Sequence, residues 1–134
     1  MKKTALFLAV TASLVLPAAT LQARPKLTPA QQLDKLLEGR VAGKPVHCIS
    51  LSDSRDTQVL DKTAIVYSSG PVIYVNRTTH PESLDSDDIQ VVRITGSQLC
   101  SLDTIQLHDR SGGFWRGFVG LENFTPYRRV AKTS

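Results

Sequence analysis

The chain has 134 residues, of which 21% are charged and 6% are aromatic, and its formal net charge is +4 at pH 7. This length is typical of a single domain. The small positive excess is not gathered into a basic stripe with stacking aromatic residues, which excludes a dedicated nucleic-acid-binding protein.

The first 23 residues have the layout of a secretory signal peptide. Lys2 and Lys3 supply a positive start, residues 5–16 form a short apolar run, and Pro17 ends it. This run is shorter than the stretch of about 20 apolar residues that a membrane span needs. We therefore expect cleavage after Ala23, a periplasmic location, and no transmembrane segment after cleavage. The mature net charge would be +2, because both lysines leave with the signal.

Residues 24–44 are predicted to form an N-terminal amphipathic helix and a linker. Thr28 is a good N-cap, Pro29 suits the first helical position, and Gln31 completes a capping box. Gly39 fits the left-handed position that ends a helix. The apolar residues of this helix recur at helical spacing and are Ala30, Leu33, Leu36 and Leu37. We expect them to cover a face or an edge of a sheet.

Residues 45–127 are predicted to form a mainly β domain, because short segments rich in β-branched and aromatic residues alternate with turn residues. We expect about six to seven short strands in a small antiparallel β-sandwich or barrel. The segments are VHCISL, TQVL, TAIVYS, VIYVN, DIQVVRIT, TIQLHD and FWRGFV. A hairpin should turn at Ser69-Gly70. Residues 128–134 are predicted to be a basic flexible tail.

Cys48 directly follows His47, which raises three alternatives for this cysteine: disulfide bonding, metal binding and nucleophilic catalysis. Two cysteines in an exported chain usually form a disulfide. Zinc sites need closely spaced ligand pairs, which the histidines and cysteines of this chain do not form. A thiol nucleophile needs a nearby base, and neighbouring residues of a strand point to opposite faces. We therefore expect no metal and no other cofactor.

Short motifs follow one another in a defined order between Pro45 and Tyr127. They are C-I-x-L at Cys48, an aspartate-led segment DTQVLDKTAIVY, Y-V-N, L-C at Cys100 and G-L-x-x-F at Gly120. This order resembles a family of small exported bacterial proteins that is classed as a domain of unknown function. The resemblance implies a periplasmic location and brings no established activity.

The same resemblance implies a disulfide between Cys48 and Cys100. Members of the family often carry two further cysteines, one before a proline in the loop after the Y-V-N strand and one before the G-L-x-x-F motif. In this chain His80 and Val119 occupy those positions. The joint loss of those two cysteines implies that they were bonded to each other, which leaves Cys48 and Cys100 as the remaining pair.

The aromatic residues near the C-terminus suggest a possible binding surface built on Trp115 and Arg116. Both residue types often carry a large share of the binding energy at protein interfaces. By strict strand alternation, Trp115 shares a face with Val119, and Arg116 shares the other face with Phe118. The alternative is that one set of aromatic side chains fills the core and the other packs beneath the N-terminal helix.

The remaining candidates for metal binding or catalysis are acidic residues and histidines. Asp85, Asp87 and Asp88 supply oxygen ligands, but the glycine and the distal glutamate of an EF-hand loop are missing, so a solvated loop is expected. His108 is predicted to point outward from its strand.

No convergent set of acid, base and nucleophile is visible in the sequence. We therefore expect a non-catalytic periplasmic binding or interaction domain, with another envelope protein as its potential partner. The alternative is a small periplasmic enzyme whose active site is assembled only in the fold, around His80 or His108.

Overall fold

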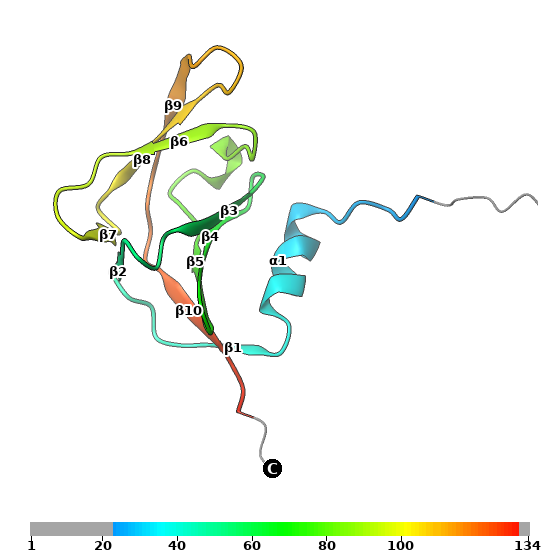
Figure 1. Cartoon of the computed structure of the whole chain (residues 1–134). Coiled ribbons are helices and arrows are strands. Elements are labelled where there is room, and N and C mark those ends of the chain that lie inside the picture. The colour runs from blue at the N-terminus through cyan, green and yellow to red at the C-terminus, as the bar shows by residue number, and fades with distance from the viewer. Residues whose placement is uncertain (1–22, 132–134) are drawn as a thin grey trace, which may run out of the picture.

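The structure is a computed structural model that describes residues 23–131, and these residues form ten β-strands and one α-helix (Figure 1). The predicted mainly β fold is confirmed. The predicted signal peptide lies outside the described residues except for its last residue, and so do residues 132–134 of the predicted tail.

The larger layer is a five-stranded antiparallel sheet with the strand order β1-β10-β5-β4-β3. Its strands are β1 (Arg40–Ala42), β10 (Thr125–Arg129), β5 (Val72–Asn76), β4 (Ala64–Ser69) and β3 (Asp56–Leu60). β4 and β5 form the predicted hairpin, but Ser69 pairs with Val72, so the turn is Gly70-Pro71 and not Ser69-Gly70. Gly70 has a φ of +52°, which glycine adopts without the steric cost of a side chain.

The second layer consists of two small antiparallel sheets. β2 (Cys48–Ser50) pairs with β7 (Gln98–Cys100). β6 (Ile89–Val92), β8 (Thr104–His108) and β9 (Trp115–Gly120) form a three-stranded sheet in the order β6-β8-β9, and the short helix η1 (Pro81–Ser83) precedes β6. The far end of the β8–β9 hairpin projects at the top of Figure 1. The whole is a small β-sandwich, one of the two predicted architectures.

Alternate residues of the facing strands form the core between the two layers. Phe124 is fully buried, and the centre of its ring lies 5.7 Å from that of Tyr67 in an edge-to-face arrangement. The other buried members of this core are Ile49, Ile65, Leu84, Leu99, Ile105, Leu107, Val119 and Leu121. Both layers contribute to this list, so burial of this apolar surface holds the sandwich together.

The helix α1 (Pro29–Leu37) covers the opposite face of the five-stranded sheet. Its capping box is present as predicted: Gln31 N donates to Thr28 Oγ1 at 3.2 Å, and Thr28 N donates to Gln31 Oε1 at 2.9 Å. Leu33 is buried against side chains of β3, β4 and β5, whereas Ala30 is exposed, in contrast to the prediction. The other buried residues of this second core cluster are Leu60, Ala64, Val66, Ile73 and Val75.

The five-stranded sheet includes residues on both sides of the boundaries predicted at residues 44 and 127. β1 lies in the predicted linker and pairs with β10. β10 continues to Arg129, so Arg128 and Arg129 belong to the sheet and not to a flexible tail. β1, β7 and β10 are the strands absent from the prediction. Two of them have three residues each, and β10 carries Pro126 and two arginines, so none shows a clear apolar alternation.

Replacing Thr28 by alanine is expected to lower the free energy of unfolding by about 1 kcal/mol, because the backbone N–H of Gln31 loses its acceptor. Urea unfolding followed by circular dichroism measures this change. Thr28→Ser is the matched control, since serine keeps the hydroxyl. Equal losses for the serine and alanine variants would contradict the role of the cap.

Candidate functional site

The cysteine pair is a structural feature of the second layer. Cys48 and Cys100 form a disulfide between β2 and β7, as predicted. They are directly opposite each other in the register, and their Cα atoms are 4.0 Å apart, close to the spacing of about 4.5 Å in non-hydrogen-bonded antiparallel pairs. Both sulfur atoms are bonded, so neither residue offers a thiol for catalysis or metal binding.

His47 lies just before β2 and is exposed. The prediction that it faces away from Cys48 rested on strand alternation, which does not govern a residue outside the strand. His47 and Cys48 in fact border the same surface hollow, together with Leu102. Because the sulfur atom of Cys48 is bonded to that of Cys100, His47 has no thiol to activate as a base.

The two histidines of the alternative enzyme hypothesis lie in different settings. His80 Nδ1 is 3.4 Å from Glu82 Oε1, and these two side chains are 64% and 70% exposed. His108 Nδ1 is 3.2 Å from the carbonyl oxygen of Gly113, and its Nε2 is 3.5 Å from Gln106 Oε1. Catalytic electrostatics are strongest where water is excluded, which is not the situation of the pair formed by His80 and Glu82. Within residues 23–131, no three His, Cys, Asp or Glu side chains are placed to hold a metal ion.

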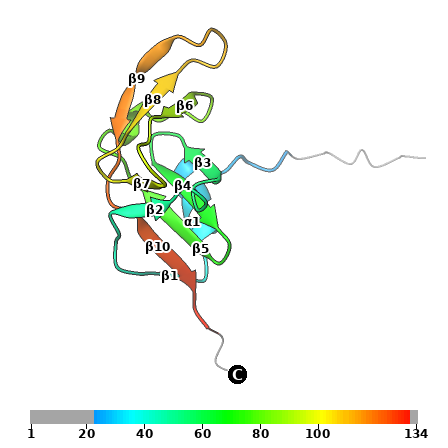
Figure 2. The same cartoon turned by 60° about the vertical axis from the view of Figure 1, so that its left-hand side comes forward.

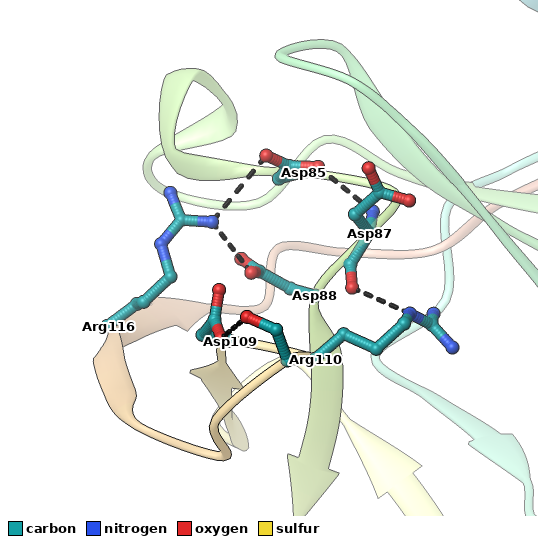
Figure 3. Close-up of a pocket in the computed structure, with 7 residues that line it drawn as sticks. Asp85, Asp87, Asp88, Asp109, Arg110 and Arg116 are labelled. Carbon is teal, nitrogen blue, oxygen red and sulfur yellow. Dashed lines mark hydrogen bonds and ion pairs between the residues drawn. The ribbon is translucent and has the colours of Figure 1, made fainter.

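Arg116 of β9 reaches across to the acidic loop that precedes β6 (Figure 3). Its Nη1 donates to Asp88 Oδ1 at 2.6 Å and lies 3.5 Å from Asp85 Oδ2. The hydrogen bond with Asp88, together with the charge of that carboxylate, raises the pKa of Arg116. The side chain of Asp88 is only 3% exposed, whereas that of Arg116 is 46% exposed. Arg116 therefore compensates a buried carboxylate within the chain, a role that the sequence did not indicate.

The rest of this acidic region is stabilised by local hydrogen bonds around a hollow of about 480 Å³. Asp85 Oδ1 accepts a hydrogen bond from Asp87 N at 2.9 Å. Asp109 Oδ1 accepts hydrogen bonds from Ser111 Oγ at 2.6 Å and from Gly112 N at 2.8 Å. Both hydrogen bonds lower the pKa of Asp109, and the one from Ser111 has the larger effect. The aspartates thus serve as acceptors in tight turns.

Trp115 and Phe118 lie on one exposed face because β9 contains a bulge. The register pairs Phe118 with Gln106 and Gly117 with Leu107, but it then shifts by one residue and pairs Trp115 with His108. An extra residue in one strand reverses the alternation on its far side. The prediction that Trp115 shares a face with Val119 is therefore wrong.

The aromatic side chains of β9 and of the residue just before it are largely exposed. Trp115 is 62% exposed, Phe118 is 58% exposed and Phe114, just before the strand, is 75% exposed. The alternative prediction that they fill the core or pack beneath the helix is wrong for all three. Gly117 was the sequence signal for the bulge, since a glycine inside a strand pattern often marks one. In the structure its φ is +146°.

The outward face of the three-stranded sheet continues from β9 across β8 to β6. Two rows of residues cross it: Trp115, His108 and Ile89 form one row, and Phe118, Gln106 and Val91 form the other. Ile89 is 42% exposed and Val91 is 37% exposed. We call these six residues the aromatic face. Each row places one polar side chain of β8 between an aromatic and an aliphatic side chain.

Among residues 23–131, no helical segment has the length and the apolar character needed to cross a membrane. No protein-family model, no curated protein and no solved structure matches the chain.

Proposed function

We propose that the protein is a non-catalytic periplasmic interaction domain that binds another envelope protein through the aromatic face. The observation that carries this proposal is the exposure of Trp115 and Phe118 on the same face of the three-stranded sheet. A folded domain gains stability by burying large aromatic side chains. Two such side chains left exposed side by side are therefore best explained by a partner that covers them.

The composition of the aromatic face favours a protein partner. Tryptophan is the residue type most enriched among side chains that dominate binding energy, and the centre of an interface is depleted of charge. The aromatic face follows this pattern, because its aromatic and aliphatic residues surround the neutral amide of Gln106 and the imidazole of His108. The expected partner surface is apolar, with one or two polar groups that form hydrogen bonds with these side chains.

The periplasmic location is part of the proposal. The disulfide between Cys48 and Cys100 supports it, because such bonds persist in oxidising compartments. The signal-peptide layout of the first 23 residues supports it as well. Expression of the full chain with and without these residues, followed by fractionation of the cells, tests the location separately from binding.

Replacing both Trp115 and Phe118 by alanine is expected to abolish capture of the partner from periplasmic extract, and Trp115→Ala alone should weaken binding to the purified partner about ten-fold or more. Mass spectrometry of the captured material identifies the partner, and calorimetry with that purified protein measures the dissociation constant. Leu102→Ala is the matched control, because Leu102 is 94% exposed but lies outside the aromatic face.

Two outcomes would overturn the proposal. One is full retention of the captured protein by a folded double variant. The other is a dimer of this chain that forms at high concentration and disappears in Trp115→Ala, since the face would then bind a second copy and not a different protein. Because both side chains are exposed, the double variant is expected to unfold at the same urea concentration as the wild type.

A further inference from the structure

A small hollow opens between the two layers of the sandwich, away from the aromatic face. It has a volume of about 240 Å³ and is bordered by residues of β3, β4, β6, β7 and β8. In Figure 2 the strands β6 and β8 lie above β3 and β4, and β3 and β6 are edge strands of their sheets. Its apolar wall consists of Val92, Ile94, Leu99 and Ile105.

Two residues that border this hollow each carry a buried polar atom without a hydrogen-bond partner among the described residues. The hydroxyl group of Tyr67 and the Nε2 atom of Gln90 are both buried and make no hydrogen bond within the described residues. Tyr67 as a whole is only 3% exposed. Buried polar groups in native proteins almost always have a hydrogen-bond partner, and leaving one without a partner is costly. Two such groups at one apolar hollow therefore indicate a ligand that completes their hydrogen bonds.

The wall of the hollow also restricts the charge of such a ligand. Among residues 23–131, no charged side chain borders it, and its polar residues are Ser54, Thr57, Tyr67 and Gln90. Burial raises the pKa of Tyr67, so its hydroxyl stays protonated and can donate. A carboxylate or an ammonium group that entered the hollow would lose its hydration without gaining an opposite charge, which is strongly unfavourable.

We infer that this hollow binds a small, uncharged amphiphilic molecule, such as a cyclic alcohol, whose oxygen accepts hydrogen bonds from Tyr67 and Gln90. The apolar body of the molecule contacts Leu99 and Ile105. Ligand sites commonly combine an apolar wall with a few polar groups that fix the orientation of the ligand, in hollows of about 300 to 1,000 Å³. This hollow lies below that range, which limits the ligand to a single ring or a short chain. The inference is independent of the proposed function, because the two surfaces share no residue.

Titration of the full chain with cyclohexanol, followed by nuclear magnetic resonance of the methyl groups, tests this inference. We expect saturable shifts at Val92, Leu99 and Ile105. Cyclohexanecarboxylate, which has a similar ring but carries a charge, should bind at least about ten-fold more weakly. Absence of saturation, or equal binding of the two compounds, would overturn the inference.

Tyr67→Phe separates ligand binding from structure, because it removes only the hydroxyl group. The affinity for cyclohexanol should fall about ten-fold, while the midpoint of urea unfolding should stay unchanged or rise, since an unpartnered buried hydroxyl group is lost. Tyr74→Phe is the matched control, because Tyr74 packs against the same core but does not border the hollow. If Tyr67→Phe bound cyclohexanol normally, or if it lowered the unfolding midpoint, the hydroxyl would serve the fold and not a ligand.

Discussion

Replacing Cys48 and Cys100 together by alanine is expected to lower the free energy of unfolding by about 4 kcal/mol. The two residues are 52 positions apart, and the chain-entropy model gives a stabilisation of about 4 kcal/mol for a closed loop of this length. A domain of this size has a net stability of about 5 to 15 kcal/mol. The disulfide therefore accounts for a large part of what keeps the protein folded.

The position of the disulfide adds a local reason for this expectation. β2 and β7 have three residues each and pair only with each other, and an isolated two-stranded pair is only marginally stable in water. The disulfide fixes the register of this pair. It thereby places Ile49 and Leu99, both buried in the core between the layers, opposite each other.

Urea unfolding of the wild type with and without a reductant, and of the double alanine variant, measures the effect. The reduced wild type and the double variant should unfold at similar urea concentrations, well below that of the oxidised wild type. A loss smaller than about 1 kcal/mol would show that the packing of β2 and β7 suffices without the covalent bond.

The helix could be predicted in detail because its signals are local. Thr28 and Gln31 form the capping box, and Gly39 has the left-handed backbone expected at the end of the helix, with a φ of +70°. Each of these interactions joins residues a few positions apart, so the sequence contains all that they require. Ala30 was misplaced because its exposure depends on how the helix lies on the sheet.

The candidate sites could be predicted only in part because they depend on contacts between distant residues. Trp115 was named together with Arg116 as a possible binding surface, but strict alternation placed it on the same face as Val119, because the bulge next to Gly117 leaves no mark in a simple alternating pattern. The addition of Ile89 to the aromatic face follows from the pairing of β6 with β8, which no local pattern indicates. Tyr67 and Gln90 meet at one hollow only because the two layers stack.

Replacing Asn76 by alanine is expected to lower the free energy of unfolding by about 3 kcal/mol, because a buried backbone donor loses its acceptor. Asn76 ends β5 and is fully buried. Its Nδ2 donates to the carbonyl oxygen of Glu122 at 2.6 Å, and its Oδ1 accepts from the N–H groups of Glu122 and Thr78, each at 3.0 Å. The two hydrogen bonds with Glu122 join the five-stranded sheet to the segment that leads from β9 to β10.

Because Phe124 lies in the same segment and is fully buried, a loosened segment should also weaken the packing between the two layers. Urea unfolding measures the loss in stability, and Asn123→Ala is the matched control because Asn123 is exposed and next to the same segment. We expect the control to stay within about 0.5 kcal/mol of the wild type. Asn76→Asp keeps the acceptor but loses the amide that donates to Glu122, so it should also be destabilised. An alanine variant as stable as the wild type would mean that water replaces the amide of Asn76, and that the junction of the two layers depends on apolar packing alone.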